Sequence, residues 1–302
     1  MRTVRAYLEL LRLPNVFTAI ADVSMGFVVT QPRGLVLGGE FAGLLIVSVC
    51  LYLAGMVLND VFDAEIDAND RPQRPIPSGR IPLGTARVVG WSLLVAGTAI
   101  GWLVSMRTGD VRAGIVATAL SACVVLYDGV LKTTFAGPLA MGGCRALNVL
   151  LGMSAATLPW SGGNVAIAAG VGLYIVGVTR FARREAKTSD PGQLALATAI
   201  MLGGIILLAE FHKFSGGEVV IDLPPRWYWF WLIIALLIVW RCVRAVATPS
   251  PTNVQAAVKH AILSLIVLDA AVCYASENRD WAFAILALLV PAMFLGRWIK
   301  ST

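Results

Sequence analysis

Long apolar segments recur along almost the whole chain, and they constrain its fold more than any other feature. Of the 302 residues 58% are hydrophobic, only 14% are charged, and the mean hydropathy is +0.77. A soluble domain carries about a quarter of charged residues, whereas a membrane-spanning helix needs roughly 20 mostly apolar residues. The apolar segments are 15–30, 41–58, 86–105, 111–126, 138–158, 163–181, 192–210, 227–246, 256–275 and 281–296.

These segments predict an all-α, polytopic membrane helix bundle of roughly nine to ten transmembrane helices. The first and last segments are short, so a bundle with one span fewer is the alternative. No stretch between the segments is long enough for a separate soluble domain, and residues 1–302 are therefore expected to form a single membrane domain.

Basic residues set the expected orientation in the cell membrane. With the N-terminus in the cytoplasm, most of the 24 Lys and Arg residues fall in cytoplasmic loops, as multi-pass proteins prefer. The polar loops 59–85, 127–137 and 180–191 then face the cytoplasm, and residues 1–13 form an amphipathic helix on the membrane surface. The net charge of +6 is explained in this way without a nucleic-acid partner.

Cysteine and histidine patterns exclude several kinds of site. The five cysteines are scattered without a CxxC pair, so neither a disulfide nor a zinc site is predicted. Two isolated histidines, His212 and His260, make neither a metal cluster nor a catalytic triad.

Acidic residues gather directly after the second apolar segment. On a continuous helix Asp60, Asp63 and Asp67 fall within an arc of about 60°, whereas Glu65 points to the far side. Three carboxylates on one stripe repel one another unless a cation lies among them, and oxygen ligands of this kind suit Mg²⁺. We therefore predict a magnesium site with Asn59 as a further ligand or as a support to the ligands. The alternative is a solvated acidic helix end.

The next residues favour the metal site over that alternative. Arg71 and Arg74 supply guanidinium groups that match phosphate oxygens. Four proline and glycine residues break the helix into a turn-rich loop at Pro72, Pro75, Pro77 and Gly79. Acids and arginines packed this closely beside a membrane suit a clamp for a metal and a diphosphate.

The same stretch resembles the UbiA superfamily of membrane prenyltransferases. The family motif NDxxDxxxD is complete at Asn59, Asp60, Asp63 and Asp67. Residues 74–79 read RPIPSG and are similar to the chlorophyll-synthase-like members of the family. The resemblance implies a central cavity open to the cytoplasm and to lipid, and an isoprenyl diphosphate as donor.

Further positions are similar to the family pattern more weakly. Tyr127 and Lys132 resemble its Tyr and Lys in the loop after the fourth helix. Arg12 and Asn15 resemble its polar start to the first helix.

The chain departs from the family at its second acidic motif, which follows the sixth helix. Residues 179–190 contain only two acids, Glu185 and Asp190, and instead carry a basic stripe of Arg180, Arg183, Arg184 and Lys187. Either this stripe contacts anionic lipid headgroups, or its cations bind diphosphate in place of a second Mg²⁺. In this respect the chain resembles divergent, EboC-like branches of the family.

A few charged and polar residues fall inside apolar segments. Arg145 lies one helical turn from Asn148 and needs a partner, because a buried arginine is costly. Asp22 and Asp269 are the acids available within the membrane. Two interpretations stay open: a structural ion pair, or a lining of the substrate cavity by Asn15, Asp22, Arg145 and Asn148.

The expected activity is that of a prenyltransferase enzyme using Mg²⁺. Asp60, Asp63 and Asp67 hold the metal, and Arg71, Arg74 and Lys132 neutralise the leaving diphosphate. Tyr127 holds a phosphate oxygen or stabilises the allylic cation through its ring. The acceptor is not identified by the sequence. The alternatives are a non-catalytic isoprenoid-binding membrane protein and a transporter.

Overall fold

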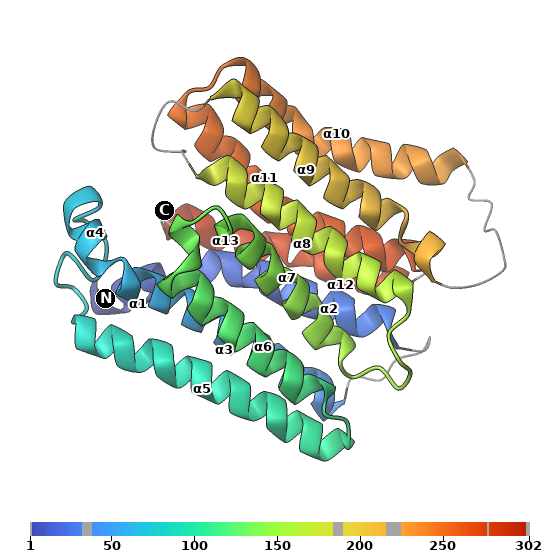
Figure 1. The fold of residues 1–302 in the computed structure, drawn as a ribbon, viewed down its shortest axis with the longest axis horizontal. Coiled ribbons are helices and arrows are strands. Elements are labelled where there is room, and N and C mark those ends of the chain that lie inside the picture. Colours follow the sequence, from blue (N-terminus) through green and yellow to red (C-terminus); the bar gives the residue numbers. More distant parts are fainter. Residues whose placement is uncertain (1, 32–37, 184–189, 216–224, 277, 300–302) are drawn as a thin grey trace.

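The computed structural model describes residues 2–31, 38–183, 190–215, 225–276 and 278–299, and this part of the chain is entirely helical (Figure 1). The α-helices are α1 (Arg2–Leu10), α2 (Val16–Val29), α3 (Gly39–Phe62), α4 (Ala64–Asp70), α5 (Leu83–Thr108), α6 (Arg112–Gly129), α7 (Gly137–Met153), α8 (Gly162–Ala182), α9 (Pro191–Ala209), α10 (Pro225–Ala247), α11 (Pro251–Ala275), α12 (Arg279–Ala287) and α13 (Leu289–Trp298). Short 3₁₀ turns are η1 (Leu13–Asn15), η2 (Leu131–Thr133) and η3 (Phe211–Phe214).

Each predicted apolar segment is helical, with the last, 281–296, divided between α12 and α13, so the predicted fold class is confirmed. Eight described helices are long and apolar enough to cross a membrane: α3, α5, α6, α8, α9, α10, α11 and the stretch Arg279–Trp298 that holds α12 and α13. The remaining segments form the shorter helices α2 and α7. The segment 138–158 was predicted too long, since α7 ends at Met153.

Helix ends follow the local sequence. Ser161, Asp190 and Ser250 cap α8, α9 and α11, each accepting a hydrogen bond from a backbone N–H of the first turn. The proline-rich stretch between α4 and α5 forms a turn-rich loop, here called the proline loop (residues 71–82), in which Gly79 takes a positive φ of 72°. The chain therefore reverses direction at these helix ends, which lie at the two ends of the bundle.

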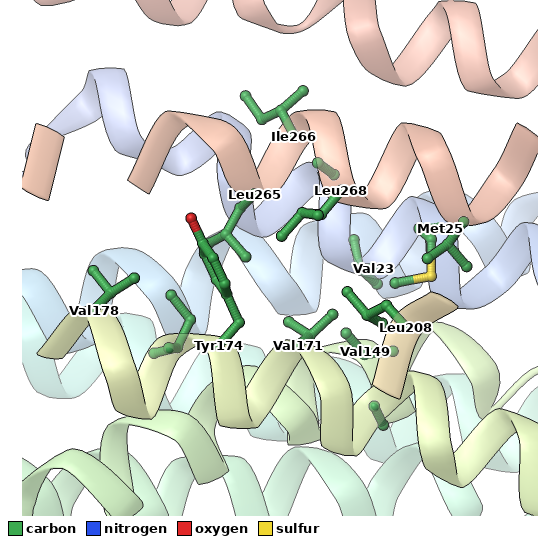
Figure 2. Packing of buried hydrophobic residues seen from close by; sticks show 14 of the residues in the cluster. Val23, Met25, Val149, Val171, Tyr174, Val178, Leu208, Leu265, Ile266 and Leu268 are labelled. Atoms are coloured by element: carbon green, nitrogen blue, oxygen red, sulfur yellow. The ribbon is translucent and has the colours of Figure 1, made fainter. Parts of the chain in front are cut away.

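The core runs through the bundle, and Figure 2 shows the part of it where α2, α7, α8, α9 and α11 meet. Tyr174 of α8 is fully buried there and donates a hydrogen bond of 2.9 Å to the backbone carbonyl of Ala261 in α11. A phenol hydroxyl in an apolar interior needs such a partner. The bond therefore ties the two helices together across the apolar core.

Glycines let several helices touch backbone to backbone. A Cβ atom added at Gly152 of α7 would lie 2.1 Å from the carbonyl oxygen of Val23 in α2. One added at Gly142 of α7 would lie 2.5 Å from the carbonyl oxygen of Gly172 in α8, and one at Gly204 of α9 would lie 2.6 Å from the backbone nitrogen of Tyr174. The row α2–α7–α8–α9 is therefore packed as tightly as helices can be.

One end of the bundle carries α1, α4 and the proline loop, and the start of α1 and the end of α13 lie at this same end (Figure 1). The apolar face of α1 is buried, with Ala6 and Leu10 packed against Ile76 of the proline loop and Val57 of α3. The predicted amphipathic helix is thus present, and its apolar face covers the loop that follows the acidic motif.

Candidate functional site

The acidic motif lies where α3 gives way to α4. Asp63 takes φ −89° and ψ 3° between the two helices, so the continuous helix that was predicted is wrong in this detail. The backbone nevertheless keeps helical spacing, because Asp63 N–H bonds the carbonyl of Asn59 and Asp67 N–H bonds that of Asp63. Asp60 and Asp67 therefore still converge, and Glu65 is exposed to the side, as the helical spacing predicted.

A single guanidinium joins two of the carboxylates. Arg74 Nη1 donates to Asp67 Oδ2 at 2.5 Å and to Asp60 Oδ1 at 3.3 Å. The three side chains are 5–9% exposed. Arg12 donates a second hydrogen bond to Asp60 Oδ1, at 2.8 Å.

Arg12 adopts an unusual backbone conformation. Its φ of 44° is the only positive φ of a non-glycine residue in the described part of the chain. Such a conformation costs free energy and persists only where the surroundings fix it. Here it accompanies the contact between the end of α1 and the acidic motif.

The loop after α6 brings a further cation to the motif. Lys132 in η2 forms an ion pair of 2.7 Å with Asp63. Tyr127, in the last turn of α6, is half-buried beside Asp128. The structure thus brings Lys132 to the acidic motif, and Tyr127 directly precedes Asp128, which accepts a hydrogen bond from Asn59 of the motif.

Asp128 belongs to the site and was missed by the sequence analysis. Its side chain is buried, and Asp128 Oδ1 accepts a hydrogen bond of 2.9 Å from Asn59 Nδ2. The signal that could have found it is a carboxylate in the last turn of an apolar helix, next to Tyr127 and four residues before Lys132. Four carboxylates and three cations now meet at this end of the bundle: Asp60, Asp63, Asp67, Asp128, Arg12, Arg74 and Lys132.

The carboxylates could receive a metal only after their present partners turn away. Among the described residues no group of three or more His, Cys, Asp or Glu side chains is arranged to hold a metal ion. Arg74 lies between Asp60 and Asp67, and Lys132 pairs with Asp63. Asp60 and Asp67 still converge on one cation position with hard oxygen donors, which is the kind of ligand Mg²⁺ takes. The donor set therefore fits the metal.

Glu9 and Arg80 form a separate ion pair at the rim, between α1 and the proline loop. Arg80 Nη1 donates to Glu9 Oε2 at 2.6 Å, and Arg5 Nε donates to Glu9 Oε1 at 3.1 Å. Burial alone would raise the pKa of Glu9, but the two guanidinium groups outweigh it and lower that pKa. Arg71, the first residue of this loop, is half-buried.

The predicted basic stripe is described only in part, because Arg184, Glu185 and Lys187 lie outside the described residues. α8 ends at Ala182, and Arg183 is its C-cap residue. Arg183 donates to the backbone carbonyl oxygens of Thr134 and Lys132. Arg183 therefore links the end of α8 to the loop that carries Lys132.

A polar cluster lies deeper in the bundle. Arg145 donates to Asp22 Oδ2 at 2.7 Å and to Thr18 Oγ1 at 2.8 Å. Its guanidinium also lies 5.5 Å from the ring centroid of Tyr52. Tyr52 precedes Asp60 by two helical turns of α3, about 12 Å. The structure thus contains the ion pair that was one of the two interpretations for Arg145.

Two further residues extend this cluster. Asn148 donates to the carbonyl oxygen of Ala19 at 2.9 Å and to Asp22 Oδ2 at 3.3 Å. Asp269 of α11 is completely buried, and neither of its carboxyl oxygens accepts a hydrogen bond from a described group. Asn15 lies at the entry to α2, where its backbone carbonyl accepts a bond from Thr18.

Comparison with known proteins extends over most of the chain. The model of the UbiA prenyltransferase family matches residues 19–265. The digeranylgeranylglyceryl phosphate synthase of Saccharolobus solfataricus is 32% identical over 151 residues, which are 50% of this chain and 51% of that protein. The alignment therefore spans about half the length of this curated relative.

Two solved structures have a similar fold. A UbiA homolog from Archaeoglobus fulgidus bound to GPP and Mg²⁺ has a TM-score of 0.60 at 13% identity, over 86% of this chain and 99% of that one. A UbiA homolog from Aeropyrum pernix K1, without ligand, has a TM-score of 0.62 at 17% identity, over 87% and 98% of the two chains. At these identities the likeness concerns the fold.

Proposed function

The chain belongs to the UbiA prenyltransferase family, and from this membership we propose that it transfers a prenyl group from an isoprenyl diphosphate to an acceptor within the membrane. The resemblance carried by NDxxDxxxD is thereby confirmed at the level of the family. The observation that most supports the activity is the meeting of four carboxylates and three cations at one end of the bundle, beside the apolar interior.

The carboxylates are the proposed metal site. Asp60, Asp63 and Asp67 would hold Mg²⁺, with Asn59 as a ligand or as a support to the ligands, and the ion would withdraw negative charge from the leaving diphosphate. A UbiA homolog with this fold has been solved with GPP and Mg²⁺, which supports a divalent metal here. Carboxylate oxygens that already converge on a shared cation support the same assignment.

The cations are the proposed diphosphate site. Arg71, Arg74 and Lys132 would contact the phosphate oxygens and stabilise the charge that grows as the allylic C–O bond breaks. The bonding electrons leave with the diphosphate, and the resulting allylic cation is captured by the acceptor nucleophile, which loses a proton. Tyr127 would hold a phosphate oxygen or stabilise the allylic cation through its ring.

The basic residues at the end of α8 have a less direct proposed role. Arg180 and Arg183 would favour an anionic ligand near this end of the bundle through their charge, and Lys187 would add to it. The contact of Arg183 with the Lys132 loop supports an action through Lys132.

The deeper polar cluster is proposed to border the prenyl cavity. Asp22 lies on α2, Arg145 and Asn148 lie on α7, and Asn15 ends η1 directly before α2. The relative from Saccharolobus solfataricus is named digeranylgeranylglyceryl phosphate synthase, so a glyceryl phosphate carrying a prenyl chain is the first acceptor to test. The orientation proposed from the basic loops puts the acidic motif on the cytoplasmic side.

The proposal is tested with purified protein in lipid nanodiscs. Isoprenyl diphosphates of graded length are supplied with Mg²⁺ and candidate acceptors, and both pyrophosphate release and prenylated product are measured. We expect release that depends on Mg²⁺ and product that depends on the acceptor. Tight donor binding without any release would instead favour a non-catalytic isoprenoid-binding protein, and transport of an unmodified isoprenoid across the bilayer would favour a transporter.

A further inference from the structure

The candidate metal position is held by a cation of the chain itself. Arg74 Nη1 contacts Asp67 at 2.5 Å and Asp60 at 3.3 Å, and all three side chains are almost fully buried. Arg12 also contacts Asp60, but in the described part of the chain only Arg74 bridges both carboxylates. An incoming divalent cation would therefore meet a guanidinium already in place.

The backbone of Arg74 is fixed, while its side chain is long enough to move. Ser78 donates from both its backbone N–H and its hydroxyl to the carbonyl oxygen of Arg74, and Ile81 N–H bonds the carbonyl of Pro75. Ile76, two residues on, is buried against Ala6 and Leu10 of α1. The proline loop thus anchors the base of the side chain beside the acidic motif, and rotations about its χ angles can carry the guanidinium to another anion nearby.

Electrostatics decide when this exchange is favourable. A divalent cation and a guanidinium repel each other if both contact the same carboxylates, so metal binding requires Arg74 to leave. A guanidinium released in a nearly buried position is costly unless another anion receives it. The diphosphate of the donor is such an anion, since its oxygens match the planar donor groups of arginine.

We propose that Arg74 substitutes for the metal in the free protein and transfers to the diphosphate when the donor arrives with Mg²⁺. This inference rests on the proposed function and adds a coupling to it: each of the two ligands binds more tightly in the presence of the other. Because coupling of this kind is reciprocal, either ligand reports on it. The free protein then does not carry an exposed metal without a donor.

Binding of Mn²⁺, a spectroscopic substitute for Mg²⁺, tests the coupling in full-length protein in nanodiscs. Electron paramagnetic resonance measures bound Mn²⁺ with and without inorganic pyrophosphate, at matched free Mn²⁺ because pyrophosphate itself binds the metal. For the wild type we expect Mn²⁺ affinity to rise at least about tenfold with pyrophosphate, within the usual range of coupling between sites.

Variants of Arg74 supply the discriminating measurement. Arg74→Gln should bind Mn²⁺ alone more tightly than the wild type does and should lose most of the gain from pyrophosphate. Arg74→Lys keeps the charge and should retain part of the competition, which guards against a folding defect in the glutamine variant. The matched control is Arg80→Gln, which removes a guanidinium from the same loop but one that pairs with Glu9, and it should behave as the wild type.

The outcomes separate this inference from the proposed function. Equal Mn²⁺ affinity of the wild type with and without pyrophosphate would overturn the coupling and leave the metal site intact. Weaker Mn²⁺ binding by Arg74→Gln in the absence of pyrophosphate would do the same. No Mn²⁺ binding by any variant under either condition would overturn both the coupling and the metal dependence.

Discussion

Asn59 of α3 donates a hydrogen bond of 2.9 Å to Asp128 of α6. The bond joins the first residue of the acidic motif to the helix that leads into the Lys132 loop. The bond fixes the orientation of the Asn59 amide, because the amide nitrogen donates to Asp128.

Substitution of Asp128 tests that bond. Asp128→Asn keeps an oxygen acceptor for Asn59, whereas Asp128→Ala leaves the half-buried Asn59 amide without one, at a cost of about 1 kcal/mol. We expect the alanine variant to unfold at a lower temperature than the asparagine variant. Equal melting temperatures of the two variants would show that the bond contributes little to stability.

Asp63 is the central carboxylate of the motif, and Asp63→Asn keeps its shape while removing its charge. We expect turnover to fall by about a hundredfold or more, the scale of losing one group that stabilises transition-state charge. Glu65→Gln is the matched control, since Glu65 is exposed and faces away, and its turnover should stay within about twofold of the wild type. Normal turnover of Asp63→Asn in folded protein would remove Asp63 from the site.

Arg183 tests the link between α8 and the Lys132 loop. Arg183→Gln removes the hydrogen bonds to the carbonyl oxygens of Thr134 and Lys132, and kcat/KM for the donor should fall by the equivalent of about 1–3 kcal/mol. In a double-mutant cycle with Lys132→Gln the two losses should not add, because Arg183 acts through Lys132. Additive losses would point instead to a direct phosphate contact or to lipid headgroups.

The two buried aspartates of the deeper cluster should respond differently to neutralisation. Asp22→Asn leaves Arg145 without its anion, and breaking a buried pair in this way costs about 3–5 kcal/mol. Asp269→Asn keeps a hydrogen-bonding side chain of the same shape next to Asp22 and leaves the Asp22–Arg145 pair in place, so the free energy of unfolding should fall by less than it does for Asp22→Asn. Thermal unfolding in detergent measures both, and a larger loss for Asp269 than for Asp22 would contradict the assignment of partners.

The ion pair between Glu9 of α1 and Arg80 of the proline loop should weaken in acid. The pKa of Glu9 is lowered from the ordinary value of 4.5 by Arg80 and Arg5, so its contribution to stability is present above that value and is lost as the pH falls through the lower pKa of the folded protein. Glu9→Gln should therefore be less stable than the wild type at neutral pH, with a difference that shrinks below about pH 4.5. A difference that grows on acidification would have the wrong sign for this contact.

The sequence predicted the helices and the acidic motif well, because both depend on local patterns. Membrane spans follow from the length of apolar segments, and Asp60 and Asp67 converge because helical hydrogen bonding continues through Asp63. The partners of these residues could not be predicted from the sequence. Arg12 reaches Asp60 and Asp128 reaches Asn59 only through the packing of separate helices, which no local spacing contains.

Local sequence patterns also failed to predict the helix break at Asp63 and the contacts of the basic stripe, for different reasons. The break at Asp63 involves a small change in one pair of backbone dihedrals, and no proline or glycine marks it. The basic stripe was predicted from helical spacing, but only Arg180 and Arg183 of it are described, and Arg183 contacts backbone carbonyls of another loop. Charge patterns at helix ends therefore located the site but did not determine which groups meet there.

The glycine contacts along α2, α7, α8 and α9 limit where a hydrocarbon chain can pass between helices within the bilayer. Where an added methyl group would lie 2.1 Å from a carbonyl oxygen of the facing helix, no hydrocarbon chain can pass between the two helices. At these contact points α2, α7, α8 and α9 leave no room for lipid between them. A long isoprenoid that reaches the acidic motif sideways from the membrane cannot enter between these helices there and has to pass elsewhere along the bundle.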